Sequence, residues 1–304
     1  MKNKDFYKQM KIQEQEKRAV GDESTADLYR AVRNHFMNFN DNQELLMKDV
    51  TPQMIHAFLK WLQEKGLRVN TVNSYLSNLR AMYNRASFGW KSRPLESPFA
   101  GIHLKREETM KRAVPVEVIK KLALLDLKDE PDKQLAVDMG LFSFLACGIP
   151  FVDIVHLTRD NLEDNGKVLS YHRQKTGIQV RMEVNQGMQL LIDRYSRPGA
   201  YYLFPLLPEN ATHEQYKYCL AVENLYLKQV CIDFGLLDIL TTYVFRHAWA
   251  SEAYHQGVPI SIISQALGHT SEKTTRIYLA AFSLDKMAEA THIVIKHVEA
   301  AMSA

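Results

Sequence analysis

Four residues near the C-terminal end of the chain combine side chains that suit chemistry at phosphate. Arg246 and His247 lie in one helical pattern, and His269 and Tyr278 belong to a second pattern that follows a short turn. Arginine can bind a phosphate through two parallel hydrogen bonds, histidine can carry a proton, and the tyrosine hydroxyl can act as a nucleophile. These residue types predict a site at which a phosphate is held and attacked.

The pattern around these residues predicts a mainly helical domain with one small antiparallel sheet. Residues 166–184 hold the clearest strand signal, because two alternating runs flank Lys175, Thr176 and Gly177 as in a hairpin. Helical periodicity covers residues 116–125, 133–146, 187–195, 216–234, 243–256 and 259–267. The sequence therefore predicts an α+β domain over residues 116–304, ended by a further helix at about 283–301.

The first part of the chain is predicted to form a separate helical domain. Residues 1–20 are polar and are expected to form a tail or a loose helix. The helical domain is expected over residues 21–104, with three or four helices between Glu23 and Ala86. Thr51 followed by Pro52 is a helix start signal, and Ser24 or Thr25 is expected to cap an earlier helix. Prolines and a nearly all-charged run then predict a basic linker at 105–115.

One expected helix of this first domain has a polar and basic face. That face carries Arg68, Asn70, Asn73, Asn78, Arg80 and Arg85, and the linker adds Lys105, Arg106, Lys111 and Arg112. Lysine and arginine displace counterions from phosphates, so both segments are candidates for contact with the DNA backbone. A solvated helix face and a flexible connector are the simpler explanations of the same residues.

Composition narrows the class of protein. The 304 residues allow two domains, and 46% hydrophobic with 24% charged residues is typical of a folded globular protein. Residues 1–112 hold 20 Lys and Arg against 13 Asp and Glu, whereas the remainder holds 18 against 22, so positive charge concentrates in the first part. No apolar run approaches the roughly 20 residues of a membrane helix, and the charged start lacks the centre of a secretory signal. Three widely spaced cysteines argue against a disulfide framework or a zinc site, and a cytoplasmic location is predicted.

The order and spacing of the motifs resemble one known family, the tyrosine recombinases or phage integrases. The resemblance rests on a lysine in a hairpin, an Arg-His pair, an LGH motif and a tyrosine nine positions after its histidine, here Lys175, Arg246, His247, His269 and Tyr278. It covers roughly residues 20–290, and the sequence TYVFRHAWASEA is most similar to integrases of Bacteroides-like mobile elements. The resemblance implies a helical, SAM-like core-binding domain followed by an α+β catalytic domain.

The resemblance also implies a role for each residue of the motif. Tyr278 would attack a DNA phosphodiester and form a 3′-phosphotyrosyl link, Arg246 would clamp the phosphate, and Lys175 would protonate the leaving hydroxyl. His269 would donate a hydrogen bond to the phosphate, and Tyr243 stands where many members carry a histidine. Because the link preserves the energy of the broken bond, strand exchange needs no metal and no nucleotide cofactor.

The sequence departs from the family at the first of its two arginines. The corresponding segment, LACGIPFVDIVHL, places Cys147 or Pro150 where that arginine is expected. The loss of one donor from such a clamp costs about 100- to 1,000-fold in rate. Arg173 lies two residues before Lys175 on the same face of a strand, so we expect Arg173 or a linker residue to compensate in part.

Two functions of different classes follow. The first is a site-specific recombinase or integrase of a mobile element, which acts on double-stranded DNA as a tetramer, with His247 and Asp153 as supporting residues. The second is a catalytically weakened relative that binds or shapes DNA, because the first arginine is absent. No ligand spacing links His247, His255 and His269, so no metal and no cofactor are predicted.

Overall fold

The chain divides into two compact units, Met1–Thr109 and Met110–Ala304. The computed structural model describes residues 4–88, 96–102, 107, 113–279, 291 and 302. The expected helix at 283–301, except residue 291, and the four basic linker residues, Lys105, Arg106, Lys111 and Arg112, lie outside these described residues. Within them, helices and one small antiparallel sheet confirm the predicted fold class, and no helix is long and apolar enough to cross a membrane.

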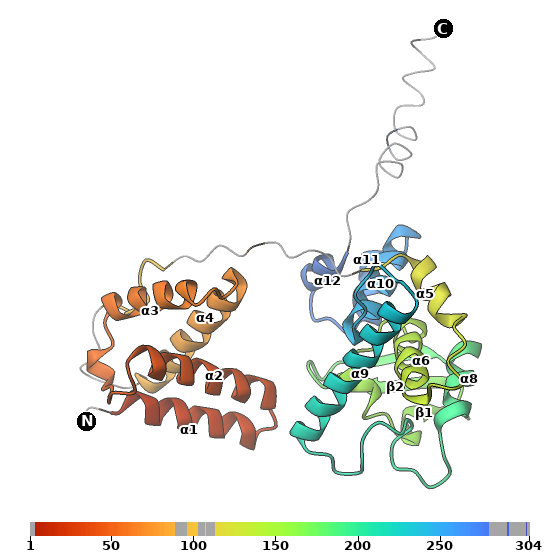
Figure 1. The fold of residues 1–304 in the computed structure, drawn as a ribbon, viewed down its shortest axis with the longest axis horizontal. Coiled ribbons are helices and arrows are strands. Elements are labelled where there is room, and N and C mark those ends of the chain that lie inside the picture. Colours follow the sequence, from red (N-terminus) through yellow and green to blue (C-terminus); the bar gives the residue numbers. More distant parts are fainter. Residues whose placement is uncertain are drawn as a thin grey trace. The chain divides into compact units, whose positions relative to one another are not determined.

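The described residues of the first unit form four helices (Figure 1). They are α1 (Phe6–Ala19), α2 (Glu23–Phe39), α3 (Pro52–Glu64) and α4 (Val69–Ala86), with a 3₁₀ turn at Met47–Asp49. Thr51 caps α3 as predicted, because its hydroxyl accepts a hydrogen bond from Met54 N at 3.2 Å. Helix α2 begins at Glu23 with Asp22 as its capping residue, so the predicted cap at Ser24 or Thr25 is wrong and both residues lie inside the helix.

Of the tail and the loose helix expected for residues 1–20, the tail is wrong for residues 6–19, which form a helix that is packed and not loose. Helix α1 starts at Asp5, whose carboxylate accepts a hydrogen bond from Lys8 N, and it packs along α2 and α4. Phe6 and Met10 are fully buried, and the Gln13 side chain donates to Met82 O at 3.0 Å. The inner face of α1, which also holds the buried Gln13 and Glu14, completes the core of the first unit.

Truncation of Phe6 tests this correction. Phe6 packs edge-on against Phe36 and Tyr83, so Phe6→Ala leaves a cavity and is expected to lower the free energy of unfolding of the first unit by about 3–5 kcal/mol. Denaturant unfolding of the full chain measures the change. The exposed Gln15→Ala on the same helix is the control, with an expected change of about 0.5 kcal/mol or less. Equal effects of the two substitutions would show that α1 contributes no more to the core than the predicted tail would.

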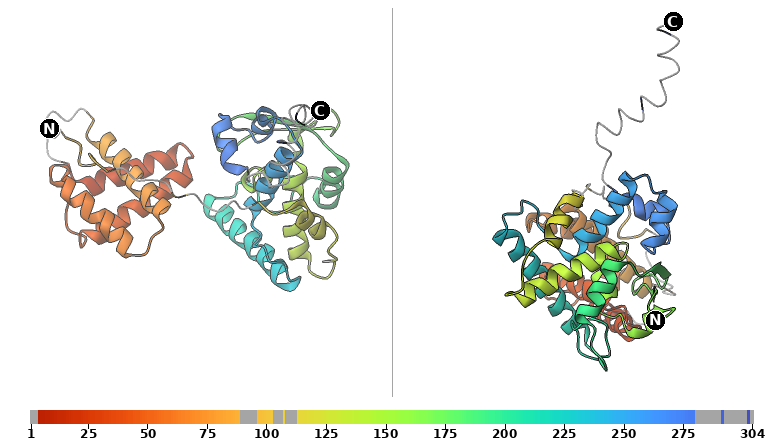
Figure 2. Two further views of the ribbon diagram at one scale, coloured as in Figure 1. Left: turned by 90° about the horizontal axis from the view of Figure 1, so that it is seen from above. Right: turned by 90° about the vertical axis from the view of Figure 1, so that its right-hand side faces the viewer.

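Helix α6 (Pro131–Leu145) lies at the centre of the second unit (Figure 2). It contacts five other helices: α5 (Val116–Ala123), α7 (Phe151–Ile154), α8 (Gln186–Tyr195), α9 (His213–Asp233) and α10 (Thr242–His255). The chain then forms α11 (Ile260–Ala266) and α12 (Glu272–Tyr278). The packing of α5, α9 and α10 on α6 buries an apolar core that holds α10 in place beneath the site.

The predicted hairpin is confirmed. Strands β1 (Leu162–Glu163), β2 (Val168–His172) and β3 (Gln179–Glu183) form one antiparallel sheet in the order β1-β2-β3, and Tyr171 lies opposite Val180. The turn closes through Gly177, which has φ +68° and donates from its N–H to Arg173 O at 2.8 Å. Since a left-handed residue reverses the chain here, Lys175 stands at the tip of the hairpin.

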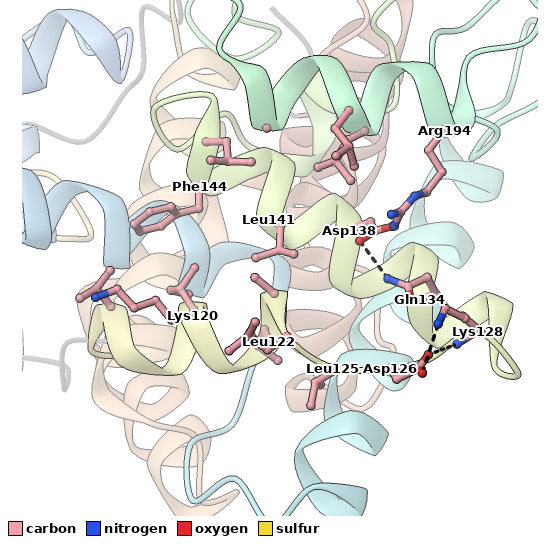
Figure 3. Close-up of a pocket in the computed structure, with 18 residues that line it drawn as sticks. Lys120, Leu122, Leu125, Asp126, Lys128, Gln134, Asp138, Leu141, Phe144 and Arg194 are labelled. Atoms are coloured by element: carbon pink, nitrogen blue, oxygen red, sulfur yellow. Dashed lines mark hydrogen bonds and ion pairs between the residues drawn. The ribbon is translucent and has the colours of Figure 1, made fainter.

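A largely apolar groove of about 900 Å³ runs between α5, α6 and α8 (Figure 3). Leu122 and Leu141 line it, and at one side Asp138 accepts hydrogen bonds from Gln134 Nε2 at 3.0 Å and Arg194 Nη1 at 2.6 Å. Its lining includes none of the residues that the sequence singles out for phosphate chemistry. The groove is therefore separate from the candidate site.

Candidate active site

Arg246 occupies the centre of the candidate site. It lies on α10 with only 1% of its surface exposed. Its Nη1 donates to Gly148 O at 2.6 Å, and its Nη2 donates to Leu267 O at 2.7 Å and lies 3.0 Å from His269 Nε2. These contacts fix the plane of the guanidinium and join α10 to the loop after α6 and to the end of α11.

Gly148 makes this arrangement possible. Its φ is +75°, and a Cβ at this position would lie 3.1 Å from both Cα and Cγ of Arg246. A side chain here would therefore push the loop away from α10, in addition to its backbone strain. The preceding residue, Cys147, also has a positive φ of 55°, so the loop turns sharply toward Arg246.

A second arginine, Arg173, enters the site from the hairpin. It is 6% exposed, its Nε donates to Asp153 Oδ2 at 2.7 Å, and its Nη1 donates to Leu267 O. Arg173 and Arg246 thus share one carbonyl acceptor.

Asp153 orients this second arginine. Its other carboxylate oxygen accepts from Gln174 N at 2.8 Å, so the hairpin is bound to α7 through both oxygens. Burial raises the pKa of Asp153, and the hydrogen bond from Gln174 and the charge of Arg173 oppose that shift. Because both oxygens already accept hydrogen bonds, Asp153 is a positioning group for Arg173.

His269 is a neutral ring in this site. Burial, followed by the charges of Arg246, Arg173 and Lys175, lowers its pKa to about 4. Arginine can only donate hydrogen bonds, so Nε2 accepts from Arg246 and the ring proton resides on Nδ1. Nδ1 lies 2.8 Å from the hydroxyl oxygen of Thr275, which accepts that proton's hydrogen bond.

Lys175 lies beside this cluster at the hairpin tip. Its side chain is exposed, and its charge contributes to the lowered pKa of His269. The next residue, Thr176, donates from its hydroxyl to Gly268 O at 3.2 Å and holds the tip against the segment that carries His269. A Cβ on Gly268 would lie 2.8 Å from Arg173 Cγ, so the close approach of hairpin and α11 requires glycine there.

Tyr278 is the last residue of α12, and its side chain lies outside what the structure describes. The helix starts at the capping residue Ser271, whose hydroxyl accepts from Lys273 N. Thr275, one turn before Tyr278, is fully buried against His269. The backbone of the predicted nucleophile is therefore linked to the cluster of Arg246 and His269 through Thr275.

The remaining predicted site residues on α10 lie one turn apart. Tyr243 is 41% exposed, whereas His247 is buried at 9%. Their rings meet edge to face with centroids 5.0 Å apart. Tyr243 is therefore the more accessible of the two, and the supporting role of His247 stays a prediction.

Cys147 and Pro150 occupy the two positions at which the first arginine of the family is expected. Cys147 is half-buried beside Gly148, and burial raises the pKa of its thiol, which keeps it protonated and apolar in character. Pro150 is buried and precedes α7 as its capping residue. Since Gly148 O binds Arg246 directly, both expected positions adjoin the site, and neither supplies a cation there.

The polar residues of α4 divide between surface and core. Asn73 is only 7% exposed, so its expected place on the exposed face is wrong. Arg80 Nη2 donates to Phe99 O at 3.0 Å, and Asn70 exchanges two hydrogen bonds with the backbone of Glu107, so both bind the segment that follows the helix. The others lie at the surface or half-buried: Arg68 is exposed, Arg85 pairs with Glu16, and Asn78 bonds Ser74 O.

Comparison with known proteins identifies the family. Residues 5–91 match the phage integrase SAM-like domain, and residues 122–283, more than half of the chain, match the phage integrase family. The chain belongs to the phage integrase family. The resemblance predicted from the sequence is thereby confirmed, while the likeness to Bacteroides-like elements stays a prediction.

Relatives and solved structures agree with this assignment. Tyrosine recombinase XerA of Pyrococcus furiosus is 23% identical over 248 residues, which span 81% of this chain and 77% of that protein. XerD of Rickettsia bellii is 20% identical over 285 residues, 88% of this chain and 87% of the relative. The Tn1549 transposon integrase in complex with transposon right end DNA superposes with a TM-score of 0.64 at 15% identity, over 96% of this chain and 100% of that one. At this identity the structural likeness establishes the fold alone.

The structure adds participants that the sequence motifs do not reveal. They are the carbonyl of Leu267, the carbonyl of Gly148 and the hydroxyl of Thr275. Backbone acceptors leave no residue-type signal, and the TT pair before Tyr278 is the only trace of the third in the sequence. Among the residues that the structure describes, no group of three His, Cys, Asp or Glu side chains is placed to hold a metal ion.

Asp153→Asn tests the role of the buried ion pair. The substitution leaves the Arg173 guanidinium buried without a countercharge, which is expected to cost about 3–5 kcal/mol in the free energy of unfolding of the second unit. Thermal and denaturant unfolding of the full chain measure it. The control is Asp160→Asn in an exposed turn seven residues later, with an expected change below about 0.5 kcal/mol. An Asp153→Asn protein as stable as this control would show that the pair contributes nothing.

Proposed function

We propose that this protein is a site-specific DNA recombinase that cuts and rejoins DNA through a 3′-phosphotyrosyl intermediate. The observation that carries the proposal is the convergence of Arg246, Arg173, His269 and Lys175 on one point beside the helix that ends at Tyr278. Fixed donors at such a point stabilise the charge that develops on a phosphate in its transition state. Family membership and curated relatives named as tyrosine recombinases support the same reaction.

In this mechanism, the oxygen of Tyr278 attacks the phosphorus as its hydroxyl proton passes to water, and the bond from phosphorus to the 5′ oxygen of the neighbouring nucleotide breaks. Lys175, exposed at the hairpin tip, is the proposed donor of the proton to that leaving oxygen. Arg246 and His269 contact the non-bridging oxygens. Attack by the 5′-hydroxyl of another strand on the phosphotyrosyl bond reverses these steps and joins the strands, so no bond energy has to be supplied from outside.

We further propose that Arg173 takes the part of the missing first arginine. A guanidinium has five N–H donors, and Asp153 and Leu267 O engage two of those of Arg173. Its position is set by the same carbonyl that binds Arg246, so the donor nitrogens of the two guanidiniums lie within roughly 6 Å of each other, given two hydrogen bonds of ordinary length. A phosphate beside them would be clamped from two segments of the chain, as by a pair of arginines.

The nucleophile is tested with DNA that traps the intermediate. A nicked duplex, built on the DNA that the protein protects from nuclease, loses a short fragment after cleavage and leaves the protein attached. Wild type is expected to form a covalent adduct that migrates with the protein in denaturing gels, and Tyr278→Phe is expected to form none while it still binds DNA. Tyr201→Phe, an exposed tyrosine of the same unit, serves as the matched control. An adduct in Tyr278→Phe would assign the nucleophile to another residue.

Arg173 is tested in the same assay. Arg173→Ala is expected to slow adduct formation by about 100- to 1,000-fold, because one clamp donor is lost. Arg173→Lys retains the charge without the planar fork and is expected to fall between the two rates. Arg181→Ala removes an exposed arginine of the adjacent strand that pairs with Glu163, and it controls for charge. Equal rates for wild type and Arg173→Ala would reject Arg173 as the replacement.

A second candidate function rests on Cys147 and Pro150, which stand where the first arginine is expected. In that case the protein binds DNA and cleaves it slowly or not at all, and stable binding without an adduct in wild type would favour it. We propose double-stranded DNA as the partner in both cases and a tetramer as the active assembly. The basic surplus in residues 1–112 supports the choice of DNA. That the protein recombines the DNA of a mobile element, and that it is located in the cytoplasm, remain predictions from the sequence.

A further inference from the structure

The hydroxyl of Thr275 is in contact with His269 from the side opposite Arg246. Thr275 is fully buried, and its oxygen lies 2.8 Å from His269 Nδ1. The other ring nitrogen, Nε2, lies 3.0 Å from Arg246 Nη2. The His269 ring is therefore held between the guanidinium of Arg246, which can only donate a hydrogen bond, and the hydroxyl of Thr275, which can donate or accept one.

This arrangement conflicts with phosphate binding unless the ring proton moves. Each of the two N–H groups on Nη2 of Arg246 has an acceptor, one in Leu267 O and one in His269 Nε2. A phosphate oxygen that binds this nitrogen has to displace one of them, and His269 is the movable one. The lone pair on Nε2 would then face a phosphate oxygen, which is also an acceptor. A stable contact requires a proton on Nε2.

We propose that Thr275 is a positioning residue that allows His269 to exchange tautomers. In the free protein its hydroxyl accepts from Nδ1–H, and in the phosphate complex it donates its own proton to Nδ1 while Nε2–H binds the phosphate. The ring stays neutral: one proton leaves Nδ1 to water, one reaches Nε2 from water, and the hydroxyl rotates. The catalytic part of this inference rests on the proposed function.

The charges around His269 favour exchange over simple protonation. Arg246 on α10 and both Arg173 and Lys175 of the hairpin place positive charge near the ring, and its pKa is lowered to about 4. An imidazolium is therefore disfavoured near neutral pH. A hydroxyl can accept a hydrogen bond from Nδ1–H in one neutral tautomer and donate one to Nδ1 in the other, without moving its oxygen. Serine shares this property with threonine, whereas valine has the shape of threonine but no hydroxyl.

Nitrogen-15 NMR of histidine-labelled full chain tests the free and the DNA-bound states. His269, assigned by the signal lost in His269→Gln, is expected to show Nδ1 protonated and Nε2 unprotonated in all free proteins, because Arg246 still donates to Nε2. When the nicked duplex is bound, wild type and Thr275→Ser are expected to move to the Nε2–H tautomer, and Thr275→Val is expected to keep the Nδ1–H tautomer or to give averaged shifts. Thr274→Val, at the exposed neighbouring position, controls for the substitution itself. A folded Thr275→Val protein whose His269 shifts change on binding DNA as those of wild type do would overturn the proposal.

Adduct formation on the nicked duplex tests the catalytic part. Thr275→Val is expected to lower its rate by about 10- to 100-fold, less than the loss of a donor itself, with DNA binding within about threefold of wild type. Thr275→Ser is expected to restore most of the rate. In a His269→Ala background, Thr275→Val should cost nothing further, because Thr275 acts through His269.

The positioning role would be rejected if Thr275→Val lowered the rate of adduct formation in the His269→Ala background as much as it does in wild type. It would also be rejected if Thr275→Ser were as slow as Thr275→Val. If wild type forms no adduct at all, the proposed function fails, and the His269 shifts still decide whether Thr275 sets the tautomer.

Discussion

The carbonyl oxygen of Leu267 is the point on which the site depends. It accepts hydrogen bonds from two buried arginines, Arg246 of α10 and Arg173 of the hairpin. Two like charges roughly 6 Å apart repel by about 3 kcal/mol at an effective dielectric constant of 20, so the pair needs compensation. The carboxylate of Asp153 and the backbone acceptors at the end of α11 and in the loop after α6 provide it. The cations are thus held in place before any phosphate arrives, which is the condition for electrostatic catalysis.

Glycine governs how closely these segments approach. At Gly148 a side chain would collide with Arg246, and at Gly268 it would collide with Arg173 and Val180. Both glycines have positive φ, so each combines the turn that the chain needs with the space that an arginine needs. The carbonyl of Gly148 accepts a hydrogen bond from Arg246, and the carbonyl of Gly268 accepts one from Thr176. Gly148 and Gly268 therefore set the turn of each loop and also supply its hydrogen-bond acceptor.

The sequence predicts well what depends on residue type and local spacing. The hairpin around Lys175, the cap at Thr51 and the helices that carry Arg246 follow from alternation, turn residues and helical periodicity. What depends on packing between distant segments is missed. Helix α1 has too few apolar residues to be recognised as part of a core, yet Phe6 and Met10 are fully buried because α2 and α4 cover one face. Asn73 lies at the border of the apolar face of α4, and only the neighbouring helices decide that it is buried. Likewise, the convergence of Arg173 and Arg246 depends on a backbone oxygen, for which no residue type is a sign.

The contacts of Arg246 also determine when the site can exist. Its partner Gly148 lies 98 residues earlier in the chain, and Arg173 is 94 residues from Leu267. Closing loops of this length is slow, and it is rewarded only when both ends are folded. During synthesis, the first two thirds of the chain can form the helical unit, α6 and the hairpin while the acceptor for both arginines has not yet been made. The arginine pair therefore cannot form before residue 267 has been made, and a shorter chain lacks the acceptor that joins the two guanidiniums.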